Sequence, residues 1–188
     1  MRIISGNYKG KKILLPKDKL TRPLKDLTKE SIFNIVQHSK LLNVKIEKSN
    51  ILDLFSGIGS FGLECLSRGA ANVTFLESYK EVLIILKKNI DNLKQQNYSN
   101  IIEKNIFSKD TLKGLNDKFD IIFMDPPYKE KKITDLLNII IELKLLKNNG
   151  IIIIHRHKKE EDIFPSEFNI MIKKNYGVSK IIFGEILN

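Results

Sequence analysis

A tetrapeptide, Asp125-Pro126-Pro127-Tyr128, carries residue types that can activate an amine attached to a nucleic-acid base. The nitrogen lone pair of such an amine is delocalised into the ring, so it is a poor nucleophile until acceptors hold its two N–H groups. The Asp125 carboxylate and the Pro126 carbonyl can accept them, the carbonyl being held stiffly because proline fixes φ. Tyr128 offers a flat surface for an extruded base. We therefore predict that Asp125, Pro126, Pro127 and Tyr128 are catalytic; the alternative is a rigid turn with a capping Asp.

A glycine-rich turn follows the first predicted strand, and its spacing admits two cofactors. Gly57, Gly59 and Gly62 satisfy the dinucleotide fingerprint GxGxxG, and Glu77 lies about twenty residues further on, where a carboxylate can hold ribose hydroxyls. Taken alone, this turn permits NAD, and a turn without any ligand is a third reading. Asp53 favours S-adenosylmethionine, because its carboxylate can meet a cationic amino group but would oppose a pyrophosphate.

The elements that position these motifs alternate between short β-branched runs and helical patterns. Strands are expected at 50–55, 72–77, 100–104, 119–124 and 151–155, and helices at 61–68, 80–96 and 131–146. The runs 168–174 and 179–186 have only a turn between them and predict an antiparallel pair. The fold class is therefore α/β and Rossmann-like, with a seven-stranded, mostly parallel sheet. Because strand carboxyl ends face the ligand crevice in such a sheet, the tetrapeptide should lie beside the glycine turn.

Positive charge gathers at the beginning of the chain. Residues 1–29 hold nine Lys or Arg and two acidic side chains, which is +7 of the net +10. This clustering predicts a polyanionic partner, most commonly nucleic acid, whereas an AT-rich genome would explain many lysines but not their position. Residues 2–5 and 11–15 predict a β-hairpin, so we divide the chain into a basic extension, 1–24, and a domain, 25–188. The predicted RNA contacts are Arg2, Lys9, Lys11, Lys12 and Arg22.

Other features of the sequence indicate the cellular compartment of the protein and whether it binds a metal. Cys65 is the single cysteine, the beginning of the chain has no apolar signal region, and no apolar run approaches the ~20 residues of a membrane span. We expect a cytoplasmic protein that does not associate with membranes. His155 and His157 alternate at the end of a strand, as metal ligands can, but no third ligand is evident. We therefore predict surface histidines and no metal.

These motifs together resemble one family of methyltransferases. The tetrapeptide and the segment 53–70 are similar to class I enzymes that modify exocyclic amines. The opening residues 2–12, the Thr21-Arg22-Pro23 step and the Tyr176-Gly177 turn narrow the resemblance to the ribosomal RNA small-subunit methyltransferase D (RsmD) family. The resemblance runs nearly end to end. It implies methylation of the N2 amine of a guanine in 16S ribosomal RNA, as part of the small subunit or its precursor, with S-adenosylmethionine as the methyl donor. We also expect the protein to be a monomer.

The resemblance also implies which residues hold the cofactor. The methionine end would be lined by Asp53, Phe55, Ser56, Gly57 and Gly59, the ribose by Glu77, and the adenine by Ser78, Asn105 and Ile106. Asn105 stands where the family usually has an Asp, and its side-chain oxygen should still accept from the adenine amino group. His155 departs from the family pattern too, because relatives commonly carry an acidic residue there.

Two other functions remain open at this stage. Asp-Pro-Pro-Tyr also occurs in enzymes that methylate adenine N6 or cytosine N4, in DNA or in other RNA, so the motif does not choose the base. The chain length disfavours sequence-specific DNA enzymes, which usually carry a separate target-recognition domain. From another class, a non-catalytic RNA-binding protein could keep a degenerate cofactor pocket, although the intact Asp53, Glu77 and Asp125 argue against it.

Overall fold

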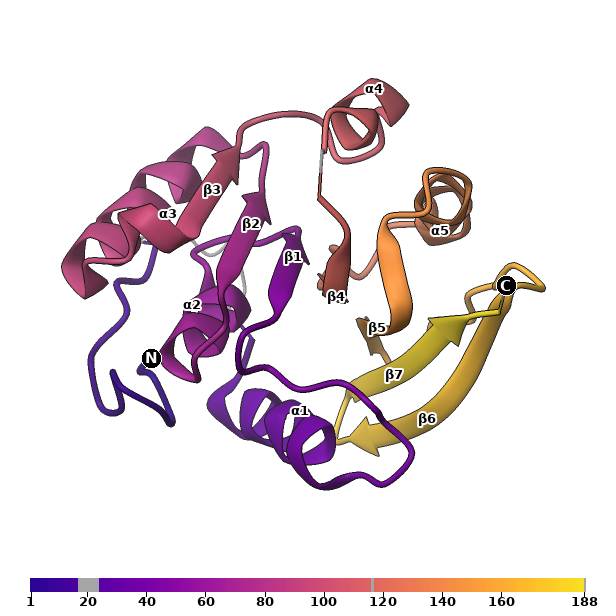
Figure 1. Cartoon of the computed structure of the whole chain (residues 1–188), viewed down its shortest axis with the longest axis horizontal. Coiled ribbons are helices and arrows are strands. Elements are labelled where there is room, and N and C mark those ends of the chain that lie inside the picture. Colours follow the sequence, from indigo (N-terminus) through magenta and orange to yellow (C-terminus); the bar gives the residue numbers. More distant parts are fainter. Residues whose placement is uncertain (17–23, 116, 188) are drawn as a thin grey trace.

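The structure is a computed structural model that describes residues 1–16, 24–115 and 117–187. Its centre is a seven-stranded sheet in the order β3-β2-β1-β4-β5-β7-β6 (Figure 1). The strands are β1 (Asn50–Leu54), β2 (Asn72–Leu76), β3 (Ser99–Ile102), β4 (Phe119–Met124), β5 (Leu146–His157), β6 (Phe168–Tyr176) and β7 (Ser179–Ile186). β1 to β5 are parallel, whereas β7 is antiparallel to both β5 and β6, so the predicted fold class and the antiparallel pair are confirmed.

Helices cover both faces of this sheet. α1 (Asp26–His38), α2 (Ser60–Ser67) and α3 (Lys80–Leu93) lie on one face, and α4 (Lys109–Lys113) and α5 (Ile133–Glu142) lie on the other (Figure 1). Each face has its own apolar cluster, one built around Phe33, Phe61 and Phe123 and the other around Leu136, Ile140 and Ile154. Within the described ranges, no helix is both long and apolar enough to cross a bilayer.

Some predicted boundaries differ from the structure. α5 stops at Glu142 instead of 146, and β5 begins at Leu146 instead of 151, because Leu146 already pairs with Phe119 of β4 across an irregular step in the ladder. Residues 147–150 are Lys, Asn and Gly, which do not predict a strand. The short helix α4 and the single-turn 3-10 helix η1 (Gln96–Tyr98) were not predicted.

The two arms of the predicted N-terminal hairpin run antiparallel and are joined by a bridge between Arg2 and Lys12 and by backbone hydrogen bonds such as Ile3 N–H to the Lys11 carbonyl, but residues 2–5 and 11–15 do not form regular strands. The physical reason is that neighbouring backbone groups bind α2 instead of the opposite arm. The N–H groups of Ile4 and Ser5 donate to the Glu64 carboxylate at 2.8 and 2.9 Å, and the Asn7 N–H donates to a carbonyl of α2. The boundary between residues 24 and 25 stays a prediction.

Glu64 joins the beginning of the chain to two helices. Its side chain is fully buried on α2 and also accepts from Arg68 Nε at 2.9 Å, while Lys29 Nζ of α1 lies 3.5 Å away. Lys29 is itself fully buried and donates to the Arg2 carbonyl at 2.9 Å. Burial lowers the pKa of Lys29, and the Glu64 charge opposes that shift. A buried charge of either sign therefore depends on its partner here.

We predict that Glu64→Ala destabilises the protein by about 3–5 kcal/mol, because it removes the carboxylate that faces the buried Lys29 charge and leaves the N–H groups of Ile4 and Ser5 without their acceptor. Urea unfolding followed by circular dichroism measures the change. The matched control is Glu103→Ala, which breaks the exposed Lys87–Glu103 ion pair and should cost no more than ~1 kcal/mol. Equal losses for the two variants would contradict the anchoring role of Glu64.

Candidate active site

A cavity of about 980 Å³ opens at the carboxyl ends of β1, β2, β4 and β5. It brings together the glycine turn after β1, the end of β2 and the tetrapeptide after β4, as the parallel sheet predicts. All four catalytic candidates line it. So do the nine cofactor candidates except Gly59, which lies within the turn itself: Asp53, Phe55, Ser56, Gly57, Glu77, Ser78, Asn105 and Ile106.

The glycine turn requires glycine where it enters α2. Gly59 has φ = +84°, and a Cβ there would lie 2.5 Å from Leu86 Cδ1 of α3. The turn is tied to both flanking strands, because Gly62 N–H donates to Asp53 Oδ2 and Gly57 N–H donates to Glu77 Oε2, each at 2.9 Å. The backbone of residues 56–60 is thus held close to the cavity.

Asp53 is a buried acid at the end of β1. Its side chain is almost wholly shielded from solvent, and burial raises its pKa well above the usual range for an Asp. The nearby carboxylates of Asp125 and Glu77 raise that pKa further, whereas the Gly62 N–H lowers it. The residues near Asp53 therefore favour a cation beside it, since a positive charge would stabilise its ionised form.

Two serines of the same turn bury hydroxyl groups without partners. Ser56 and Ser60 both line the cavity, and the buried Oγ of each has no hydrogen-bond partner among the described residues. An unsatisfied buried hydroxyl is costly, and it is usually explained by a ligand or water that completes it. With the shielded carboxylate of Asp53, these hydroxyls fit a ligand that carries an amino acid group. Ser60 was not predicted.

The predicted adenine and ribose residues occupy the other end of the cavity. Glu77 Oε1 accepts from the N–H groups of Ser78 and Tyr79 at 2.8 Å, which fixes its carboxylate at the end of β2. Asn105 Oδ1 accepts from the Phe107 N–H at 3.0 Å, so the oxygen expected to bind adenine already holds its own turn. Ile106 is buried beside it. The phenyl rings of Phe55 and Phe107 meet here with centroids 5.7 Å apart.

The tetrapeptide begins where β4 ends. Asp125 N–H donates to the Leu54 carbonyl at 3.4 Å, and its carboxylate is partly exposed to the cavity. The Pro127 carbonyl accepts from Glu130 N–H at 2.9 Å. Among the described residues, neither Asp125 Oδ2 nor the Pro126 carbonyl accepts a hydrogen bond. Two acceptors on adjacent residues are therefore available at the mouth of the cavity.

The prediction that both strand-end histidines lie at the surface is wrong for His155. This residue is only 6% exposed, and its Nδ1 lies 2.7 Å from Asp125 Oδ1. The reason is the register of the sheet, because Met124 pairs with Ile154 and the next residue of each strand therefore meets the other. His157 is half-buried. Within the ranges that the structure describes, no group of His, Cys, Asp and Glu has the arrangement of a metal site.

Sequence reasoning also missed cavity residues from distant elements. Leu24, Lys25 and Thr28 reach it from the beginning of α1, and Val178 and Ser179 reach it from the turn between β6 and β7. None of them belongs to a recognisable motif. The sequence did offer one signal for His155 and His157, which also line the cavity. They form the polar end of β5, a strand that is otherwise apolar and lies next to β4.

The predicted RNA contacts lie elsewhere. Lys9, Lys11 and Lys12 are exposed but do not line the cavity. Their turn packs against Ser67, at the opposite end of α2 from the glycine turn. Because α2 has eight residues, roughly 12 Å of helix separates the two. Arg2 is exposed beside this turn, and Arg22 lies outside the described residues.

Comparison with known proteins identifies the family. The model of the family described as conserved hypothetical protein 95 matches residues 1–185. A "Ribosomal RNA small subunit methyltransferase D" from Buchnera aphidicola is 34% identical over all of this chain and 92% of its own length. Two solved structures, proposed methyltransferases from Escherichia coli and Haemophilus influenzae, cover 100% of this chain and 98% of theirs, with TM-scores of 0.83 and 0.78 and identities of 25% and 32%. The chain belongs to the ribosomal RNA small-subunit methyltransferase D family.

Proposed function

We propose that this protein transfers a methyl group from S-adenosylmethionine to the N2 amine of a guanine in 16S ribosomal RNA. The proposal is supported by one observation: the same cavity holds a buried acid and two oxygens that accept no hydrogen bond among the described residues. Asp53 lies at the end of β1, and the Asp125 carboxylate and Pro126 carbonyl lie at the end of the neighbouring β4. One end suits a cationic amino acid group, and the other suits an amine with two hydrogens.

At the cofactor end, the residues bind and orient. The Asp53 carboxylate would accept from the ligand ammonium, and the hydroxyls of Ser56 and Ser60 would complete their hydrogen bonds with its carboxylate. Glu77 would accept from ribose hydroxyls, and Phe55, Ser78, Asn105 and Ile106 would enclose the adenine. When bound, S-adenosylmethionine supplies an electrophilic methyl group on a sulfonium.

At the amine end, the residues turn a poor nucleophile toward that methyl group. Asp125 Oδ2 and the Pro126 carbonyl would accept the two N–H hydrogens of the guanine N2 amine, which leaves its lone pair free to point into the cavity. Tyr128 would stack on the base. As the N–C bond forms, the nitrogen gains positive charge, and the Asp125 carboxylate stabilises it and is the nearest acceptor for the proton that must leave.

The substrate class rests on the relatives. Three relatives that are 34–36% identical to this chain are named as small-subunit ribosomal RNA methyltransferases, and this chain aligns with them nearly end to end. The same substrate would place the protein in the cytoplasm. Its monomeric state, and whether it acts on the assembled subunit or its precursor, stay predictions.

The most direct test of this activity is Asp125→Ala. We predict that the wild-type protein, S-adenosylmethionine and unmodified small-subunit RNA yield N2-methylguanosine, and that Asp125→Ala lowers the rate by at least about 10²-fold because the amine loses its charged acceptor. Mass spectrometry of nucleosides identifies and quantifies the product.

Two controls separate the steps of this experiment. Asp125→Ala should bind S-adenosylhomocysteine nearly as well as the wild type in calorimetry, because Asp125 is assigned to the amine. Asp117→Ala, at an exposed position, should methylate RNA at the normal rate. Methylated adenine or cytosine as the product would contradict the guanine assignment, and an active Asp125→Ala variant would contradict the mechanism.

Asp53→Asn should have opposite effects on stability and binding. Because the folded-state pKa of Asp53 is raised, the stability of the ligand-free wild type is greatest while Asp53 is protonated and falls as the pH rises through that pKa. An Asn cannot ionise, so the variant should be more stable than the wild type at pH 8. Its melting temperature should rise by about 2–4 °C for each kcal/mol added to the free energy of unfolding, and the difference from the wild type should be smaller near pH 4.

The same variant should bind S-adenosylhomocysteine about 10- to 100-fold more weakly, because it loses a charged hydrogen bond worth ~1.5–3 kcal/mol. Differential scanning calorimetry and titration calorimetry measure the two effects. Unchanged affinity would remove Asp53 from the ligand site.

The basic turn should contribute RNA affinity without touching the reacting base. We predict that replacing Lys9, Lys11 and Lys12 together with Gln weakens RNA binding and reduces the slope of log affinity against log salt by roughly 0.7–0.9 per lost phosphate contact. The control replaces the exposed Lys104, Lys113 and Lys118, which removes the same charge from another part of the surface. If both triple variants reduce the slope equally, the N-terminal lysines have no special role.

A further inference from the structure

The carboxyl end of β5 contacts three different parts of the tetrapeptide. Its last residues are His155, Arg156 and His157, and the parallel register with β4 sets them beside Asp125 and the residues that follow it. Nothing in the amine chemistry described so far uses these three side chains. Each of them nonetheless has a defined contact.

His155 holds one oxygen of the Asp125 carboxylate. Its Nδ1 lies 2.7 Å from Asp125 Oδ1, and its Nε2 lies 2.9 Å from Ser179 Oγ on β7. An ionised carboxylate can only accept, so Nδ1 carries the hydrogen of the first bond, and Ser179 fixes the ring from its other side. Because Oδ1 is engaged and Oδ2 is not, the carboxylate is held with a single oxygen left for the amine.

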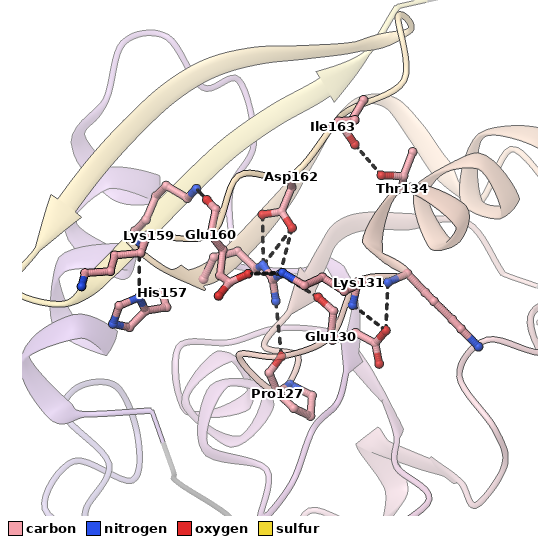
Figure 2. Close-up of polar contacts among 12 residues, drawn as sticks. Pro127, Glu130, Lys131, Thr134, His157, Lys159, Glu160, Asp162 and Ile163 are labelled. Atoms are coloured by element: carbon pink, nitrogen blue, oxygen red, sulfur yellow. Dashed lines mark hydrogen bonds and ion pairs between the residues drawn. The ribbon is translucent and has the colours of Figure 1, made fainter.

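Arg156 holds the backbone of the tetrapeptide. Its fully buried guanidinium donates to the Pro127 carbonyl at 3.3 Å and to the Glu130 carbonyl at 2.8 Å, and it pairs with Asp162 at 2.8 Å. Figure 2 labels these three partners of the guanidinium, Pro127, Glu130 and Asp162. The ion pair between Lys131 and Glu160, also drawn there, joins the same two segments. The loop after β4 is thus fastened to the loop after β5.

His157 contacts the aromatic member of the motif. Its ring meets the ring of Tyr128 edge to face, with centroids 5.2 Å apart and planes at 64°. The ring of His155 lies 6.3 Å from Tyr128 in a similar arrangement. Edge contacts of this kind fix the orientation of an aromatic ring without covering both of its faces.

We propose that His155 is the positioning residue for the amine acceptor: it holds Asp125 Oδ1 so that Oδ2 faces the substrate amine, within a frame that Arg156 and His157 complete. This inference rests on the proposed function and adds the residue that orients its acceptor. Removal of the Nδ1 donor frees the carboxylate to rotate, and a misplacement of about 1 Å in a catalytic group can cost ~10²-fold in rate.

The test compares His155→Leu with His155→Asn, whose side-chain N–H₂ can occupy the place of the Nδ1 donor. We expect His155→Leu to lower kcat for methyl transfer about 10²-fold, with KM for RNA and affinity for S-adenosylhomocysteine within about twofold of the wild type. His155→Asn should regain at least about tenfold of that loss. His38→Leu, the same replacement at an exposed position on α1, should behave as the wild type.

Each outcome decides between the claims. If the wild type methylates guanine but His155→Leu has a normal kcat, the positioning role is overturned while the proposed function stands. Equal losses in His155→Leu and His155→Asn, or a loss that appears in KM or in thermal stability alone, would assign His155 to packing. If the wild type itself does not methylate guanine in RNA, the proposed function fails and the inference fails with it.

Discussion

The register of the parallel strands β1, β4 and β5 determines which side chains meet at the cavity. Asp53 on β1 pairs with Phe123 on β4, and Met124 on β4 pairs with Ile154 on β5. The next residues, Asp125 and His155, therefore stand side by side at the edge where Asp53 approaches the cavity. A shift of one residue between β4 and β5 would turn one of these side chains to the opposite face, because successive side chains alternate.

This register concentrates negative charge in a shielded place. Asp53, Glu77 and Asp125 come from three strands and interact within one cavity, and burial raises the pKa of Asp53. Such crowding opposes stability in the ligand-free protein, as do the unpaired hydroxyls of Ser56 and Ser60. Stability is recovered elsewhere, in the two apolar clusters on the faces of the sheet. The same crowding of carboxylates would favour a positively charged ligand beside Asp53.

Periodicity predicted the sheet and its antiparallel pair because the strand runs are short, apolar and separated by clear helices or turns. It predicted the meeting of the glycine turn and the tetrapeptide for the same reason, since both follow parallel strands. His155 was misassigned because a polar side chain after an apolar strand resembles one that faces solvent. The burial of Arg156 depends on Asp162, which lies in a loop without periodicity.

Local competition for hydrogen bonds explains the remaining differences. The two arms of the predicted hairpin do not form regular strands because Glu64 takes the N–H groups of Ile4 and Ser5, and Asn105 uses its oxygen in its own turn. A residue-type pattern does not reveal which of two partners a backbone group will choose. The sequence pattern likewise does not predict that Ser60 lines the cavity, because this depends on how the first turn of α2 packs beside β1.

We propose that two acids of one cavity have separate roles: Asp53 binds the cofactor, and Asp125 binds the substrate amine. A crystal structure with S-adenosylhomocysteine and a short guanine-containing RNA tests it most directly. We predict that the ligand ammonium contacts Asp53, that guanine N2 lies within hydrogen-bond distance of Asp125 Oδ2 and the Pro126 carbonyl, and that His155 still holds Oδ1. A guanine whose N2 amine points away from Asp125, or a cofactor ammonium distant from Asp53, would contradict the account.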